Sequence, residues 1–350
     1  MLLERLPQLR VAVNSRCGRS CFFCRPSGEA ISTPPHRDID PDTLVILARA
    51  FVLFGLREIK LTGGDPALWE PLAAIVPRLK KEAGMEHIEI ISRHPQIGEL
   101  ASALALGGVD VINVSVDSLR PELHREITGV DDLPDVLYAL EKCVDTGVSV
   151  KVNTVVLAGV NDAELEDIIS YCEVRGVAIL KFLDVIQDMG EGVESYGRRL
   201  RHLRRRTLPE LYRPLGDLAE ELRQRAVKVR QLQQGGLGHP MTSFRLSSGL
   251  DVVLKDHSAG AWYGSVCDSC HLYPCHDALM ALRVTADLRL QFCLLRENVA
   301  VDLKPHLNGG FDTLARILGD ALAVYDTADF HAPSVAQRRS SARELRVLGG

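Results

Sequence analysis

Residues 16–24 read Arg-Cys-Gly-Arg-Ser-Cys-Phe-Phe-Cys, so that Cys17, Cys21 and Cys24 follow one another with the spacing C-x3-C-x2-C. A structural zinc site takes four ligands, whereas three thiolates placed this closely favour an iron–sulfur cube with one iron left open. An open iron can bind a small ligand. The alternative is a zinc site, or three unrelated buried cysteines. This stretch is therefore the first candidate for a metal centre.

The segment before the cysteines predicts where they lie in the fold. Residues 9–13 (Leu-Arg-Val-Ala-Val) form an apolar run that predicts a β-strand, and the cysteine loop follows it directly. In barrels and open α/β sheets, the loops at the carboxyl ends of the strands carry the active site. We therefore expect the three cysteines at that end of the sheet.

After this loop, strand and helix patterns alternate along the chain. The expected strands are residues 9–13, 58–61, 87–91, 109–115, 149–157 and 178–184. The expected helices are residues 43–54, 68–83, 97–106, 121–127, 133–146 and 162–175. Asp40 and Pro41 provide a start signal for the first of these helices. Strands that alternate with helices form a parallel sheet, so the sequence predicts an α/β fold.

The character of the chain changes after residue 187. Six arginines fall between residues 198 and 206, which predicts either a solvated linker helix or a clamp for phosphate groups. A further helix is expected over residues 208–229, and hairpins around Gly249 and Asp287. We therefore expect a barrel over residues 1–187, a helical basic connector over 188–237, a second, cysteine-bearing domain over 238–331 and a tail over 332–350.

Composition sets limits on the class of protein. The chain has 350 residues, of which 46% are apolar and 25% charged, as is usual for a globular protein. The net charge of −5 argues against nucleic acid as a partner. The sequence shows neither a secretion signal nor a membrane span, so we expect a cytoplasmic protein with reduced thiols.

The cysteine spacing, with Phe23 before the last cysteine, resembles that of the radical S-adenosylmethionine (SAM) enzymes. In that family a [4Fe-4S] cluster binds SAM at its open iron and cleaves it to a 5′-deoxyadenosyl radical, which takes hydrogen from the substrate. The resemblance implies that Cys17, Cys21 and Cys24 bind the cluster and that Phe23 belongs to the SAM site. It also implies a partial (β/α)6 TIM-like barrel.

Several later motifs match the SAM site of that family. Gly63-Gly64-Asp65 resembles its Gly-Gly-Glu motif, with Asp65 in place of Glu, where the SAM amino group is held. Two glycines allow a ligand to approach the backbone closely, although a plain βα turn is the alternative. By the same resemblance, three further polar side chains are SAM contacts, namely Ser92, Ser115 and Asn153.

Phrases at residues 61–64, 114–119, 127–129, 152–156 and 282–287 resemble one branch of the family, the GTP 3′,8-cyclases. These enzymes join C3′ of the ribose to C8 of guanine and carry an auxiliary [4Fe-4S] cluster in a C-terminal, twitch-like domain. The resemblance assigns this cluster to Cys267, Cys270 and Cys293, and an insertion adds Cys275 as a possible fourth ligand. With four ligands, no iron would remain open for guanine.

The branch also implies residues around the substrate. Arg10, with the terminal Gly349-Gly350, matches catalytic positions. The expected substrate contacts are Arg10, Lys60, Lys151, Lys181 and Arg283. Two basic positions of the branch are lost, because Glu58 stands for a lysine and Ala281 for an arginine. Arg93 and His94 are new polar groups at the end of the third strand, where an exposed turn is the alternative reading.

Together these features predict a radical SAM enzyme with two [4Fe-4S] clusters and SAM. Its expected reaction is carbon–carbon bond formation on a nucleotide or phosphorylated nucleoside, close to GTP 3′,8-cyclisation. The alternatives are a specialised-metabolism relative that acts on another nucleotide, an enzyme that modifies a peptide or oxidises an alcohol, and a zinc-binding structural protein. We expect a flavodoxin or ferredoxin-type reductant, no membrane partner, and leave a homodimer open.

Overall fold

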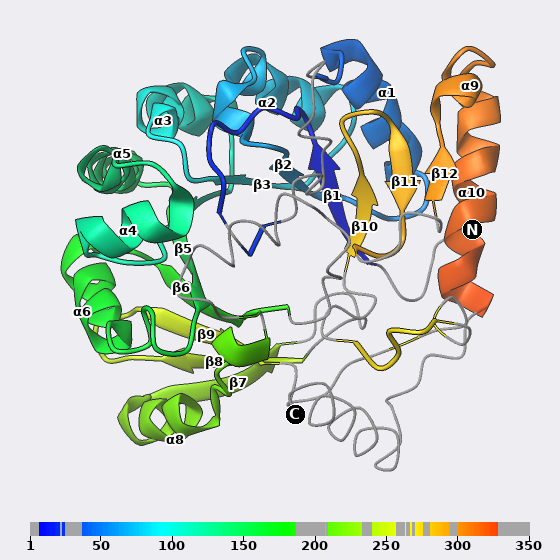
Figure 1. Ribbon diagram of the computed structural model, residues 1–350. Helices are drawn as coiled ribbons and strands as arrows, with labels where there is room; N and C mark the ends of the chain where they lie inside the picture. The colour runs from blue at the N-terminus through cyan, green and yellow to red at the C-terminus, as the bar shows by residue number, and fades with distance from the viewer. Residues whose placement is uncertain are drawn as a thin grey trace.

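The computed structural model describes residues 7–21, 23–24, 37–186, 207, 209–232, 240–256, 263, 267, 270–275, 281–294 and 300–327. Twelve strands form one sheet in the order β12-β11-β10-β1-β2-β3-β4-β5-β6-β9-β8-β7. Figure 1 shows that the sheet curves, with helices α1 to α6 along its outer side. This arrangement confirms the expected α/β fold of a partial barrel.

The first six strands follow the expected order and are all parallel to their neighbours. Their bounds are β1 Gln8–Ala12, β2 Glu58–Thr62, β3 His87–Ser92, β4 Val111–Ser115, β5 Ser149–Val156 and β6 Ile179–Asp184. Because all six run the same way, the loops that follow them meet at one edge of the sheet. The cysteine loop after β1 lies at this edge.

Helices connect consecutive parallel strands. Their bounds are α1 Pro41–Val52, α2 Leu72–Lys81, α3 Gln96–Gly107, α4 Pro121–Thr128, α5 Leu133–Asp145 and α6 Leu165–Arg175. The predicted start of α1 is confirmed, because the Asp40 carboxylate accepts a hydrogen bond from the Thr43 backbone N–H at 2.9 Å. A short 3-10 helix, η1 Pro66–Leu68, follows β2.

Strands from the second half of the chain extend the same sheet at both edges. β9 Asp251–Lys255 pairs in parallel with β6, and β10 Ala281–Val284 pairs in parallel with β1. Antiparallel strands follow outside them, namely β7 Lys228–Leu232, β8 Met241–Arg245, β11 Arg289–Gln291 and β12 Ala300–Asp302. The hydrogen-bonded sheet therefore runs across the expected boundary at residue 238.

The hairpins expected around Gly249 and Asp287 are confirmed as β8–β9 and β10–β11. The helix expected over residues 208–229 forms only in its middle part, and residues 209–215 form the 3-10 helix η2 Pro209–Leu211 and a loop instead. α8 Gly216–Arg225 ends before Ala226, and residues 228–232 pair with β8 instead. Pairing with a neighbouring strand outweighs local helix spacing here. The remaining helices are α9 Lys304–Leu307 and α10 Phe311–Thr327.

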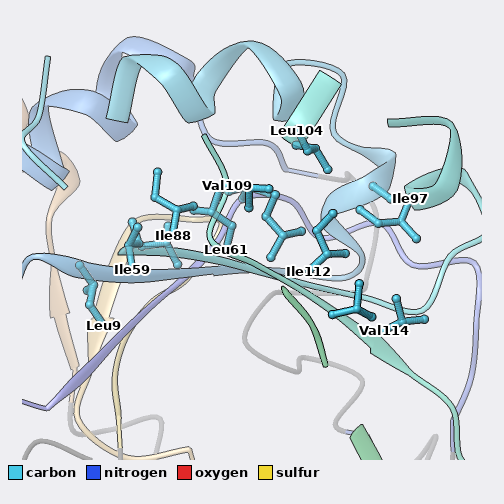
Figure 2. Packing of buried hydrophobic residues seen from close by; sticks show 14 of the residues in the cluster. Leu9, Ile59, Leu61, Ile88, Ile97, Leu104, Val109, Ile112 and Val114 are labelled. Carbon is cyan, nitrogen blue, oxygen red and sulfur yellow. The ribbon is translucent and has the colours of Figure 1, made fainter. Parts of the chain in front are cut away.

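One large apolar core lies between the sheet and the helices. On the strands it includes Leu9, Ile59, Ile88 and Ile112, each at most 1% exposed. Figure 2 shows these side chains beside Leu104 of α3. Since side chains alternate across a strand, the residues between these apolar positions face the inside of the barrel. Among the described residues, no helix is long and apolar enough to cross a membrane.

Two leucines of α3 test this layer, because Leu104 is fully buried and Leu106 is 91% exposed. Leu104→Ala should lower the free energy of unfolding by about 2–5 kcal/mol, since it leaves a cavity between α3 and the sheet. Leu106→Ala should change it by no more than about 0.5 kcal/mol. Chemical denaturation followed by circular dichroism measures both. Equal effects of the two substitutions would contradict the assigned face of α3.

Candidate active site

The loop that carries Cys17, Cys21 and Cys24 leaves β1 at the carboxyl edge of the sheet. Val13 N–H donates to the Thr62 carbonyl of β2 at 2.9 Å, which continues the pairing of β1 with β2 into the start of the loop. None of the three cysteines forms a disulfide. The Cys24 N–H donates to the Cys21 carbonyl at 3.1 Å, so these two cysteines share one turn.

The Gly63-Gly64-Asp65 turn holds the start of the cysteine loop. The Gly64 N–H donates to the Asn14 carbonyl at 2.9 Å, and the Asp65 N–H to the Arg16 carbonyl at 2.6 Å. A Cβ on Gly64 would lie 2.2 Å from the Arg16 carbonyl oxygen, and one on Gly63 2.6 Å from the Asn14 side-chain oxygen. The absence of a Cβ on the two glycines therefore admits the cysteine loop, and their contact with SAM stays a prediction.

The Asp65 carboxylate ties together the turns after β2 and β3. It accepts hydrogen bonds from Ser92 Oγ at 2.6 Å, the Arg93 N–H at 2.9 Å, the His94 N–H at 3.1 Å and the Ala67 N–H at 3.1 Å. Asp65 is 2% exposed, and each of its carboxylate oxygens accepts two of these bonds. The carboxylate thus positions the β3 turn, and the predicted contact of Asp65 with the SAM amino group stays a prediction.

Arg19 anchors the cysteine loop on its other side. Its side chain is 2% exposed and forms an ion pair with Asp132, which also lies 2.9 Å from His124 Nε2. The Ser20 N–H donates to the Thr128 carbonyl at the end of α4 at 2.9 Å. Sequence reasoning missed Arg19, because its position between two cysteines was the only signal. The loop is therefore held by α4 and by the residue before α5.

Ser115 and Asn153, both expected to contact SAM, lie side by side. Ser115 at the end of β4 is paired in register with Asn153 within β5. The Asn153 side-chain oxygen is buried and has no hydrogen-bond partner among the described residues. Buried polar atoms are normally satisfied, so this oxygen fits a bound polar ligand. The three thiols, which form no disulfide, and this acceptor fit a cluster with SAM beside it.

The inside of the barrel is lined by cations. Arg10 is paired in register with both Lys60 and Arg283. Lys181 is 6% exposed, and burial together with Lys151, Lys60, Lys255 and Arg10 lowers the pKa of its ammonium group well below the ordinary range. The structure thus brings together all five predicted substrate contacts, which are Arg10, Lys60, Lys151, Lys181 and Arg283. It adds Lys255 on β9.

Glu89 of β3 pairs with two of these cations, and Asp184 of β6 lies 3.6 Å from the Nζ of a third, Lys255. The Glu89 oxygens lie 2.6 Å from Lys60 Nζ and 3.1 Å from Lys151 Nζ, and Glu89 accepts from Asn113 Nδ2 at 2.8 Å. Glu89 is 4% exposed. Sequence reasoning missed it, because a lone charge in an apolar strand does not show which strands lie beside it. Burial and the neighbouring lysine lower the pKa of Lys60 to about 8 despite this partner.

The residues that depart from the cyclase pattern, Glu58, Arg93 and Ala281, lie in different surroundings. Glu58 is exposed at the start of β2, so water screens its carboxylate. A buried carboxylate would repel the phosphates of a substrate, but this cost does not apply to an exposed one. Arg93 is not part of an exposed turn. It donates to the Asp117 carboxylate at 2.7 Å, and its side chain is 15% exposed. Ala281 is fully buried on β10.

The second cysteine group gathers around Tyr263. This side chain is 2% exposed and packs against both Cys267 and Cys275. The Tyr263 hydroxyl also donates to the Cys275 carbonyl. The Cys270 N–H donates to the Cys267 carbonyl at 2.9 Å, which forms one turn. Cys275 therefore lies in the same small cluster as Cys267. Cys293 follows the end of β11.

Some predicted residues lie outside the described part of the chain, namely the arginines at 198–206 and the terminal Gly349 and Gly350. Within the described part, no three His, Cys, Asp or Glu side chains converge as a preformed metal site. The case for metal at either cysteine group therefore rests on the chemistry of the thiols and on their shared loops.

Comparison with known proteins gives a consistent result. The family described as the Radical SAM superfamily matches residues 11–172. A probable GTP 3′,8-cyclase of Archaeoglobus fulgidus is 30% identical, with 85% of this chain and 88% of the relative covered. A probable GTP 3′,8-cyclase of Thermococcus kodakarensis is 29% identical, with 89% of this chain and 93% of the relative covered. A GTP 3′,8-cyclase of Rhizobium etli is 28% identical, with 98% of this chain and 91% of the relative covered.

Among solved structures, the chain is similar to Streptococcus suis SuiB bound to S-adenosylmethionine, with a TM-score of 0.58 and 12% identity. The similarity covers 85% of this chain and 63% of SuiB, so it spans less than two thirds of that protein. At this level of identity the likeness concerns the fold alone.

The contact between the Gly63-Gly64 turn and the cysteine loop predicts the effect of one methyl group. Gly64→Ala should displace Arg16 and so reduce the iron that the N-terminal cysteines retain after anaerobic reconstitution. Gly216→Ala is the matched control, because no atom lies within 4 Å of the added Cβ. Iron analysis and absorbance near 400 nm, where iron–sulfur clusters absorb, measure the effect, with circular dichroism as a check of folding. Full iron content in Gly64→Ala would contradict this role.

Proposed function

The chain belongs to the radical SAM superfamily, and we propose that it forms a carbon–carbon bond within a nucleotide, as a GTP 3′,8-cyclase or a close relative of one. Enzymes of this family use a [4Fe-4S] cluster and SAM. The observation that carries the proposal is the set of buried cations inside the barrel. Lys60 lies on β2 only three residues before Gly63, so these cations are close to the cysteine loop.

We propose that Cys17, Cys21 and Cys24 hold the first cluster, which supplies the electron that cleaves SAM. The backbone of Gly63 and Gly64 and the ring of Phe23 lie around the same loop. Ser115 and Asn153 are proposed to orient SAM by hydrogen bonds. The buried, unpaired Asn153 oxygen supports this role, because a donor from a ligand would satisfy it.

We propose that the cations of the barrel bind the phosphate groups of the substrate. Lys181 has no acidic partner in the described part of the chain, and its neighbours Lys60 and Lys151 share Glu89. A phosphate at Lys181 would stabilise its charged form and give charge-assisted hydrogen bonds. Arg10 and Arg283, side by side on β1 and β10, would orient the same ligand and place its ribose for hydrogen abstraction.

The second cysteine group is proposed to hold an auxiliary [4Fe-4S] cluster. Cys267, Cys270 and Cys293 are the ligands that the cyclase pattern requires. The shared contacts of Cys267 and Cys275 with Tyr263 support Cys275 as the fourth ligand. With four thiolates the cluster would be closed, and it would act as an electron relay or a structural element. The Gly349-Gly350 tail stays a proposal for the catalytic site.

One observation favours a relative that acts on a nucleotide other than GTP. Glu89 already neutralises Lys60 and Lys151, and a triphosphate would compete with this buried carboxylate for both lysines. A closed auxiliary cluster would leave no iron for guanine. The domain bounds, the cytoplasmic location, the flavodoxin or ferredoxin-type reductant and a homodimer also remain proposals.

The first experiment is anaerobic incubation of the reconstituted enzyme with SAM, dithionite and a panel of nucleotides, followed by measurement of 5′-deoxyadenosine and product mass. We expect a nucleotide to stimulate deoxyadenosine release and to yield a product with a new carbon–carbon bond. A product that is an isomer of GTP would identify the cyclase reaction. Turnover of another nucleotide would identify a relative of the cyclases that acts on that nucleotide. Stimulation by none of the panel would contradict a nucleotide substrate.

The role of Lys181 predicts a selective loss of affinity. Lys181→Ala should weaken binding of the active nucleotide by roughly tenfold to a hundredfold, because a hydrogen bond to a charged group contributes about 1.5–3 kcal/mol. Lys81→Ala is the control, since Lys81 is exposed on α2. Isothermal titration calorimetry measures both. Unchanged affinity in Lys181→Ala would place the phosphates elsewhere.

A further inference from the structure

Arg93 lies between the cysteine loop and the barrel. It is the first residue after β3, and its Nη1 donates to the Asp117 carboxylate at 2.7 Å. Its guanidinium carbon lies 5.8 Å from the centre of the Phe23 ring, a cation–π contact with the residue that precedes Cys24. One side chain thus connects the end of β3, the turn after β4 and the cysteine loop.

Both ends of Arg93 are fixed by further hydrogen bonds. Its backbone N–H donates to the Asp65 carboxylate at 2.9 Å. Asp117 is 1% exposed, and its other oxygen accepts from the Val155 N–H of β5 at 2.9 Å. A guanidinium held at both ends keeps its charge in one place.

This charge lies close to the thiols of Cys17 and Cys21. Both thiols interact electrostatically with Arg93, and together with Asp117 they keep its pKa above the ordinary range despite burial. The Arg93 guanidinium is bonded to the Asp117 carboxylate, and its backbone N–H is bonded to the Asp65 carboxylate. Arg93 is therefore the cation that offsets the carboxylates of Asp65 and Asp117 beside this loop.

The other basic groups near the loop are less suited to this task. Arg16 pairs with Asp38, and its side chain is 41% exposed. Arg19 is paired with Asp132 on the side of α4. His94 has its pKa lowered by burial, which favours the neutral imidazole. If Arg93 lost its charge, the buried Asp117 carboxylate would have no cation bonded to it among the described residues.

We propose that Arg93 is a positioning residue of the cluster site, which places a fixed positive charge beside Cys17 and Cys21 and holds Phe23 against the barrel. One-electron reduction of a thiolate-bound cluster adds one negative charge and breaks no bond. A nearby cation stabilises the reduced state, so Arg93 raises the reduction potential of the first cluster. This role is independent of which nucleotide is the substrate.

The test is a redox titration of the reconstituted full-length protein with dithionite, followed by electron paramagnetic resonance. The signal that changes on addition of SAM identifies the first cluster. In Arg93→Gln, reduction of this cluster should become about tenfold less favourable, which is 59 mV for a one-electron couple. Arg93→Lys keeps the charge and should stay close to wild type. Arg57→Gln removes an exposed arginine and should change nothing.

A wild-type potential in Arg93→Gln, with full iron content, would overturn the proposal and leave Arg93 a structural role only. If Arg93→Gln does not retain iron, the Arg93→Lys variant decides. If Arg93→Lys retains iron and has a wild-type potential, the result supports the proposed role of the positive charge. Loss of iron from both variants would overturn the proposal. None of these outcomes depends on nucleotide turnover, so they are distinct from a failure of the proposed reaction.

Discussion

The close approach of the cysteine loop to the turn after β2 is the constraint on which the site depends. The carbonyls of Asn14 and Arg16 accept backbone hydrogen bonds from Gly64 and Asp65, at a separation that leaves no room for a Cβ on Gly64. Through its carboxylate, Asp65 then holds the turn after β3. The three turns at the carboxyl edge therefore form one unit, and a shift in any of them would move the cysteines.

The interior of the barrel is organised by charge. A group of cations buried together raises the free energy of the empty protein, because each loses hydration and repels the others. Glu89 reduces this cost for Lys60 and Lys151, while Lys181 is left without an acidic partner among the described residues. An excess of buried positive charge is typical of a site that binds an anion, since the charge of the ligand neutralises the cations. The same carboxylate also limits how much negative charge the site accepts.

Fixed arginines hold the cysteine loop from two sides. Arg19 reaches Asp132 near the start of α5, and Arg93 reaches Asp117 after β4. Both carboxylates lie on segments that precede or follow helices of the barrel, so helix packing and loop position are coupled. The cysteine loop is thus attached to α4, to the residue before α5 and, through Arg93, to the turns after β3 and β4. This arrangement is suited to chemistry in which two reacting centres must keep a constant separation.

The sequence by itself determined the alternation of strands and helices and the identity of the thiol groups, because apolar periodicity and cysteine spacing are local properties. It also placed Ser115 at the end of the fourth strand and Asn153 on the fifth. Only the tertiary structure decided that β9 and β10 extend the parallel sheet, and that Glu89 lies between Lys60 and Lys151. These features depend on the pairing of strands distant in the chain, and local spacing carries no information about that register.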